Sequence, residues 1–309
     1  MYKGYASDTI WKEIQEYLPQ ENRLDDSNMP KEEWIEIDKN TIHIDHYSCK
    51  NPKGVIIIYH GVGGNGRLLS FIAAPLHRAG YEVVCPDLPL YGHSICEGKI
   101  TYADWVECGV MIAEKFQQKD KPFFLVGLSA GGMLAYQISC RLKSLNGLLI
   151  TCLLDQRISR VTKQTASSSM MAVVGKPFLK VAHTMIGEVR IPMRMVCNMK
   201  AIVNNKMLAE LLMSDPISSG TKVTLAFLYG MLNPMIEIEA EDYDKCPVLL
   251  VHPEKDNWTD LSLSRLFFDK IKAPKELKIL QGAGHFPIEE KGLKQLEEYC
   301  LAFMDKERI

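Results

Sequence analysis

The segment GLSAG at residues 127–131 places one hydroxyl group, that of Ser129, between small residues. An apolar run, FFLV, precedes it, and an amphipathic stretch follows it. The pattern G-x-S-x-G in such a context is typical of a nucleophile on a sharp turn between a buried strand and a helix. Gly127 and Gly131 have no side chains, so the backbone at this turn could pass close to neighbouring segments of the chain. The simpler interpretation is a tight turn on which the serine has no chemical role. Residues elsewhere in the chain distinguish the two interpretations.

A serine hydroxyl is a poor nucleophile unless a base and an acid assist it. Asp256 lies in VHPEKDNW, just after the apolar run VLLV, and His285 lies in LQGAGHFP, just after ELKIL. The order serine, acid, histidine, with each residue after a predicted strand, is that of one hydrolase fold. We therefore predict Ser129 as nucleophile, His285 as general base and Asp256 as the acid that orients it.

Two other acids compete with Asp256 for this role. Asp155 ends the predicted strand that follows the helix after Ser129, and Asp260 is expected to cap the next helix. We favour Asp256 over both. Among the other histidines, His252 is interpreted as structural.

An ester-cleaving serine also needs N–H donors for the oxyanion that forms on the substrate. The amide of Ala130, directly after the nucleophile, is one expected donor. HGVGG at residues 60–64 follows the first long predicted strand, and we assign the second donor to the Val62 N–H. His60 and Gly61 are expected to orient this loop rather than act chemically.

Strands and helices alternate along the chain and must position these residues. Continuous apolar runs such as VIIIYH (55–60), YEVVCPD (81–87) and PFFLVG (122–127) are typical of strands buried on both faces. Helices are predicted near 67–78, 102–116, from 130, 259–273 and from 288, and a hairpin at 34–37 and 41–45. The alternation predicts an α/β fold with a mostly parallel sheet and helices on both faces.

The alternation stops between residues 156 and 245, which read as helices and loops. A structureless loop of this length is improbable in a compact domain, so we predict a helical cap (lid) inserted into a core of residues 1–155 and 246–309. This cap holds ten of the fifteen methionines, Met170 and Met171 among them. They suit either an apolar acyl pocket or ordinary packing of a small subdomain.

Composition and charge argue against some classes of function. The 309 residues are 47% hydrophobic and 24% charged, with a formal net charge of -2, so no basic surface for nucleic acid is expected. No signal peptide or run long enough to span a membrane is visible, and the nine cysteines include no C-x-x-C pair. We expect a cytoplasmic protein that needs no metal or organic cofactor and does not insert stably into membranes.

Five motifs, HGVGG, DLPLYGHS, GLSAGG, EKDNW and GAGHF, occur in the order of the α/β-hydrolase superfamily, which the chain resembles from about residue 54 to its end. The resemblance implies the α/β-hydrolase fold and a cap after the sixth strand. It is strongest to the serine-hydrolase branch with monoacylglycerol lipases, lysophospholipases and carboxylesterases. The chain departs from that branch where Leu90 replaces a glycine and where the fuller lipase signature after His-Gly is missing.

The resemblance and the triad together predict a serine hydrolase that cleaves a small-molecule carboxylic ester with an apolar acyl part. A thioesterase, an aminopeptidase or a cofactor-free perhydrolase of the same fold remains an alternative. So does a ligand-binding relative without activity. The sequence leaves the oligomeric state open.

Overall fold

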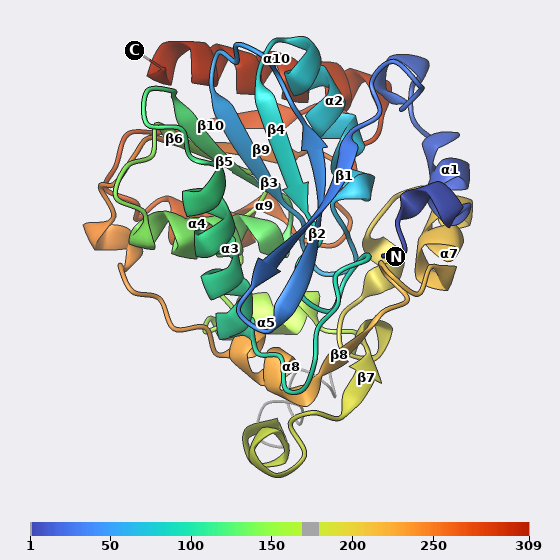
Figure 1. Cartoon of the computed structure of the whole chain (residues 1–309). Coiled ribbons are helices and arrows are strands. Elements are labelled where there is room, and N and C mark those ends of the chain that lie inside the picture. Colours follow the sequence, from blue (N-terminus) through green and yellow to red (C-terminus); the bar gives the residue numbers. More distant parts are fainter. Residues whose placement is uncertain (1, 169–178, 309) are drawn as a thin grey trace.

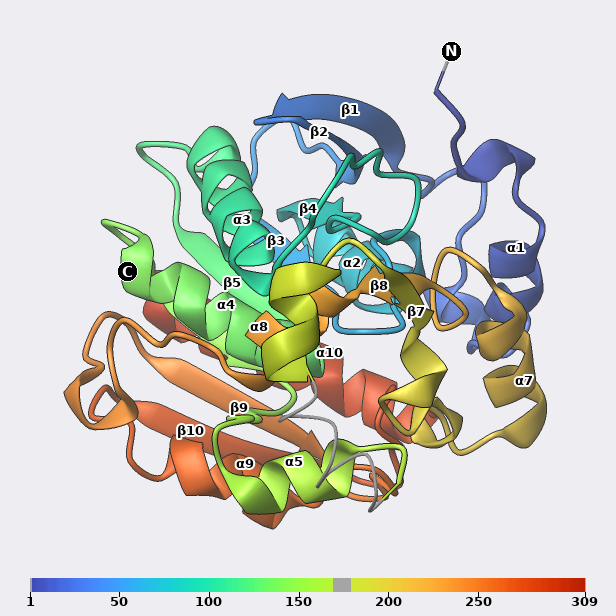
Figure 2. The same ribbon diagram turned by 90° about the horizontal axis from the view of Figure 1, so that it is seen from below.

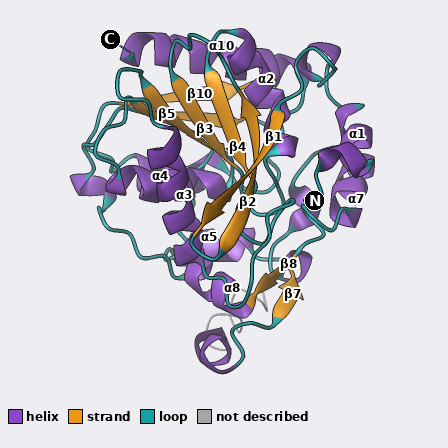
Figure 3. Cartoon of the chain, viewed as in Figure 1, coloured by secondary structure: helices purple, strands orange, loops and turns teal. Residues whose placement is uncertain are grey.

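The computed structural model describes residues 2–168 and 179–308, and its centre is a twisted sheet (Figures 1 and 3). Within the described residues the sheet has eight strands in the order β1-β2-β4-β3-β5-β6-β9-β10. The strands are β1 (Lys31–Ile37), β2 (Asn40–Tyr47), β3 (Val55–Tyr59), β4 (Glu82–Pro86), β5 (Phe123–Gly127), β6 (Gly147–Ile150), β9 (Val248–Pro253) and β10 (Lys275–Leu280).

The sheet is parallel from β4 to β10, whereas β1 and β2 form the predicted hairpin and join β4 in antiparallel fashion. Every residue of β3, β4, β5 and β6 is buried, as expected for strands covered on both faces. The prediction of a mostly parallel α/β sheet is confirmed. The strand that was predicted to end at Asp155 is shorter than expected, because its pairing ends at Ile150.

Helices cover both faces of this sheet. On one face α2 (Ser70–Arg78) packs against α10 (Glu290–Glu307), and on the other α3 (Tyr102–Phe116) packs against α4 (Ala130–Arg141). The shorter α9 (Leu261–Phe268) joins α4, since Phe267 and Tyr136 form an edge-to-face ring pair. The helix predicted over 259–273 is thus shorter than expected. Asp260 caps it, as predicted, by accepting a hydrogen bond from the Ser262 amide.

Residues 156–245, here called the insertion, run between the neighbouring strands β6 and β9. Figures 1 and 2 show its elements α5, α8, β7 and β8 gathered near one end of the sheet. The elements are α5 (Ser159–Thr165), a helix that includes residues 179–185, β7 (Arg190–Pro192), α7 (Lys206–Ser214), β8 (Lys222–Thr224) and α8 (Leu225–Leu232). The small antiparallel sheet of β7 and β8 was not expected from the sequence.

The N-terminal segment packs on the core. Its helix α1 (Ile10–Gln15) and the residues after it bury Trp11, Ile14 and Leu18, which the sequence places at helical spacing. In both Figure 1 and Figure 2, α1 lies beside α7 of the insertion. No helix within the described residues is long and apolar enough to cross a bilayer.

Candidate active site

Ser129 stands on a strained turn between β5 and α4. Its backbone angles, φ 57° and ψ −126°, are rare for a residue with a side chain. The turn needs glycine on both sides, because a Cβ atom on Gly127 would meet the Gly131 carbonyl and one on Gly131 would meet the carbonyls of Tyr59 and His60. The Ser129 amide donates a hydrogen bond to Thr151 Oγ1 (3.0 Å) at the end of β6. This local geometry presents the Ser129 hydroxyl above the carboxyl end of the sheet.

The structure brings Ser129, His285 and Asp256 together in one hydrogen-bonded chain. The distance from Ser129 Oγ to His285 Nε2 is 2.7 Å, and that from His285 Nδ1 to Asp256 Oδ2 is 2.8 Å. Ser129 and His285 are buried, and the side chain of Asp256 is only 2% exposed. The carboxylate on Nδ1 requires the proton there, so Nε2 is free to accept a proton from the serine hydroxyl.

Asp256 is held in its ionised form by several donors. Burial alone would raise its pKa, but His285 and the amide and hydroxyl groups of Thr259 hold that pKa below its usual range. Its Oδ1 accepts from the amides of Trp258 and Thr259, and its Oδ2 also accepts from the Thr259 hydroxyl (2.7 Å). The competing acid Asp155 instead forms an ion pair with Arg157 (2.9 Å).

The HGVGG loop (residues 60–64) lies against the amide of Ala130. A Cβ atom on Gly61 would come within 2.8 Å of the Ala130 nitrogen, so only glycine permits this approach. Val62 and Ala130 both line the same cavity as Ser129. The two residues predicted to donate to the oxyanion therefore flank the serine.

His60 is buried beneath this loop. Its Nε2 accepts a hydrogen bond from the Leu88 amide (2.9 Å), so its Nδ1 carries the proton and donates to the Gly61 carbonyl (2.8 Å). Burial lowers the pKa of His60 to about 4. Its neutral ring thus connects the HGVGG loop to the segment after β4, and both ring nitrogens are engaged by these backbone groups.

A cavity with about 530 Å³ of empty space, part of it open to solvent, adjoins Ser129. Its lining residues are Val62, Tyr102, Ser129, Ala130, Met133, Leu154, Gln156, Thr165, Cys197, Met231, Pro234, Trp258 and Thr259. The lining is mostly apolar and includes no acidic or basic side chain among the described residues.

The methionines of the insertion mostly serve other purposes than lining this cavity. Met231 lines it, whereas Met193 and Met199 are core residues and others, such as Met185 and Met207, are exposed. Met170 and Met171 lie outside the described residues. Packing is thus the better interpretation for the core methionines.

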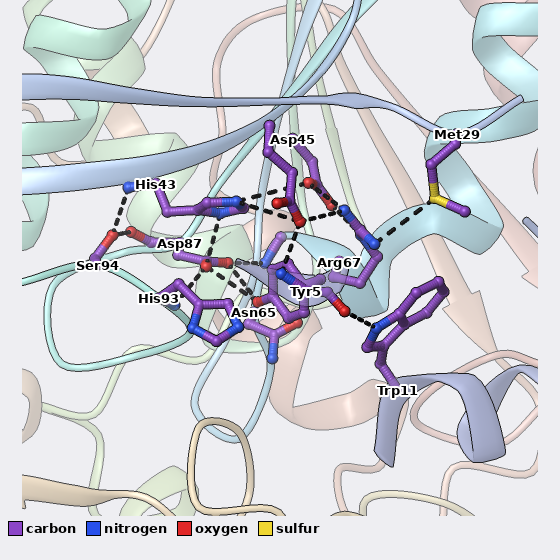
Figure 4. A network of polar contacts seen from close by, with 12 residues as sticks. Tyr5, Trp11, Met29, His43, Asp45, Asn65, Arg67, Asp87, His93 and Ser94 are labelled. Atoms are coloured by element: carbon purple, nitrogen blue, oxygen red, sulfur yellow. Dashed lines mark hydrogen bonds and ion pairs between the residues drawn. The ribbon is translucent and has the colours of Figure 1, made fainter. Parts of the chain in front are cut away.

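A buried polar network lies behind the HGVGG loop and is centred on Asp87 (Figure 4). Asp87 accepts hydrogen bonds from the amides of Gly66 (2.7 Å) and His93 (2.8 Å) and from the hydroxyl of Tyr5 (3.0 Å), and the His43 ring lies 2.9 Å away. Burial alone would raise the pKa of Asp87, but His43 and the amide donors hold it below its usual range. The network ties the N-terminal segment to the residues that follow the HGVGG loop.

Arg67 continues this network towards the N-terminal segment. Its guanidinium group pairs with Asp45 and with Glu32 (3.0 Å) and lies 4.6 Å from the ring centres of Tyr5 and Trp11 (Figure 4). Glu32 and Asp45, with His43, are close enough together to hold a metal ion. Since Arg67 already pairs with both carboxylates, their charge is balanced by the protein itself.

Sequence reasoning missed Thr259 and Thr151. Thr259 donates to Asp256 and has its Oγ1 3.2 Å from His285 Nδ1, and Thr151 accepts from the Ser129 amide. The spacing DNWT, with threonine three residues after the acid, was an available signal for Thr259 because it matches an Asx-type turn. No comparable local signal marks Thr151.

The parallel sheet, the serine on its strained turn after β5 and the insertion after β6 define an α/β-hydrolase. Residues 50–292 match the family model described as "Serine aminopeptidase, S33". The chain therefore belongs to this serine-hydrolase family of the α/β-hydrolase superfamily. No curated protein sequence matches it significantly.

Solved structures with the same fold include lipases and esterases. A soluble variant of monoglyceride lipase from Saccharomyces cerevisiae, bound to a substrate analog, is similar with a TM-score of 0.76 and 19% identity, over 94% of this chain and 99% of that one. Monoacylglycerol lipase from Paleococcus ferrophilus has a TM-score of 0.67 and 19% identity, over 85% of this chain and 98% of that one. A carboxyl esterase from Bacillus coagulans has a TM-score of 0.64 and 16% identity, over 90% of this chain and 99% of that one. At these identities the likeness shows the fold.

Proposed function

We propose that the protein is a serine esterase that hydrolyses a carboxylic ester with an apolar acyl part. The observation that carries the proposal is the continuous hydrogen-bonded chain from Ser129 through His285 to Asp256 beside an apolar cavity. His285 Nε2 takes the proton of the Ser129 hydroxyl as Ser129 Oγ attacks the ester carbonyl. Asp256 keeps the imidazole oriented and stabilises its protonated form.

The amides of Val62 and Ala130 are the donors for the oxyanion of the tetrahedral intermediate. His285 then gives its proton to the leaving alcohol, and an acyl-enzyme on Ser129 remains. Water enters and His285 takes a proton from it as the water oxygen attacks the acyl carbonyl. His285 then returns this proton to Ser129 Oγ as the bond between the acyl group and Ser129 breaks, which releases the acid. Every proton in this sequence passes through His285, so the cycle returns the enzyme to its starting state.

The cavity favours an ester over a peptide with a free amino terminus. An aminopeptidase has to bind the ammonium group of its substrate, for which a carboxylate is the ordinary partner. No acidic side chain lines the cavity within the described residues. We propose that the insertion acts as a cap over the acyl part, since five of its residues line the cavity: Gln156, Thr165, Cys197, Met231 and Pro234.

Ser129→Ala tests the proposal directly. If the three residues act as a unit, kcat on p-nitrophenyl esters should fall on the order of a million-fold. The control is Ser144→Ala, an exposed serine after α4 that does not touch the site; it should retain full activity and full labelling by a fluorophosphonate. Esterase activity or labelling retained in Ser129→Ala would refute the assignment. Faster turnover of amino-acid amides than of esters by the unaltered enzyme would favour the aminopeptidase.

A further inference from the structure

The insertion reaches the HGVGG loop through a buried serine. The hydroxyl of Ser219, which is fully buried, donates a hydrogen bond to the carbonyl of Gly63 (2.9 Å). Gly63 has a positive φ of 83°, and a Cβ atom there would meet the ends of the Met199 and Ile202 side chains, so these two residues of the insertion lie close against it. The HGVGG loop, which follows β3, is therefore packed against three side chains of the insertion.

This contact lies next to one of the two proposed oxyanion donors. Gly63 directly follows Val62, whose amide is that donor. Within the loop itself, the Gly64 amide donates to the Gly61 carbonyl over 3.2 Å, which closes a short turn. The Ser219 hydroxyl restrains the carbonyl of Gly63, the residue after Val62, from the insertion side. Without it, that buried carbonyl loses its partner and the turn can shift to find another.

The neighbouring Ser218 provides a matched comparison. Ser218 is also fully buried, and its hydroxyl donates to Asp215 Oδ2 (2.6 Å). That hydrogen bond stays inside the insertion, whereas the one from Ser219 crosses to the HGVGG loop. The two serines thus have the same size, burial and number of donated hydrogen bonds, and differ in what they restrain.

We propose that Ser219 is a positioning residue that holds the Val62 amide in place for the oxyanion, so that the insertion takes part in catalysis as well as in substrate binding. This inference rests on the proposed esterase function. A donor has to lie within hydrogen-bonding distance of the oxyanion before the reaction begins, because reorganisation during the reaction raises the barrier. A contact that fixes the loop in advance meets that requirement.

The experiment compares Ser219→Ala with Ser218→Ala, using p-nitrophenyl acetate, a substrate too small to depend on a long acyl pocket. Loss of a whole oxyanion donor costs about 100-fold to 1,000-fold in kcat. A loosened donor should cost less, so we expect kcat to fall about ten-fold in Ser219→Ala with KM nearly unchanged. Ser218→Ala should keep the kcat of the unaltered enzyme. Tm is measured for both, because a role in folding alone would lower Tm without this kcat effect.

Equal kcat values in the two serine variants would overturn the inference. If Ser219→Ala does not fold, Ile202→Val replaces it, since this change removes the one methyl group of Ile202 that packs on Gly63; a several-fold loss of kcat supports the inference and an unchanged kcat overturns it. Failure of the proposed function gives a different result, because the unaltered enzyme would then neither hydrolyse the ester nor react with a fluorophosphonate.

Discussion

Replacing His60 by glutamine tests whether a buried neutral imidazole supports the HGVGG loop. Burial lowers the pKa of His60 to about 4, whereas a histidine in an unfolded chain titrates at about 6.5. Between these two pH values the unfolded chain binds a proton that the folded chain does not. The stability that His60 contributes is therefore complete above about pH 6.5 and is lost as the pH falls towards 4.

The magnitude follows from the same two values. A single proton changes the free energy of unfolding by about 1.4 kcal/mol per pH unit, so the interval from about 6.5 to about 4 corresponds to about 3 kcal/mol. Glutamine does not titrate in this range, and its amide can still accept from the Leu88 N–H. The unaltered protein and His60→Gln are compared by their free energies of unfolding. The difference between the two should thus decrease by about 3 kcal/mol as the pH falls from about 6.5 to about 4.

The assay is urea unfolding at several pH values between about 4 and 7, followed by tryptophan fluorescence, for which Trp105 beside the His60 ring is a reporter. An equal dependence on urea concentration in both proteins would show that the same surface is exposed on unfolding. A stability difference that stays constant with pH would refute the argument. So would a loss of kcat in His60→Gln at neutral pH as large as that expected for Ser129→Ala, because His60 would then act in the chemistry.

Two further predictions concern the acid and the loop after β4. Thr259→Val removes the hydroxyl donor to Asp256 at constant volume, so kcat should fall about ten-fold with KM unchanged; equal kinetics would show that the amide donors suffice. Leu90 has a φ of 79°, which costs a residue with a side chain about 1 kcal/mol or more. Leu90→Gly should therefore be more stable than Leu90→Ala to urea, the reverse of the order found in helices, and the usual order there would contradict the strain.

The positions of Ser129, Asp256 and His285 could be anticipated because parallel topology leaves little choice. Each residue lies in the loop or turn that follows a strand, and the carboxyl ends of parallel strands meet at one edge of the sheet. The role of His60 was open to the same reasoning, since its place at the end of β3 next to glycine suggested support for the loop. These predictions depend on local pattern and on strand order, both of which the sequence displays.

Other features depend on contacts between distant residues that leave no local pattern. Tyr5 and Asp87 are 82 residues apart, and Ser219 and Gly63 are 156 apart. Strands β7 and β8 have three residues each, too few for an alternation of apolar and polar side chains to appear. Leu90 was visible as a departure from the family pattern, but the sequence did not reveal that Leu90 has a positive φ.

The two sets of distant contacts act on neighbouring positions, Gly63 within the HGVGG loop and Gly66 just after it. The Gly66 amide donates to Asp87, which Tyr5 and His43 hold in a buried, charged pocket. Buried charges add little net stability, because their desolvation offsets their attraction, but removing one partner leaves the other uncompensated. Such a network therefore contributes little to the free energy of unfolding. Its main effect is to make one conformation of the folded chain more stable than similar alternative conformations. An oxyanion donor needs that kind of restraint, since its position matters more than its strength.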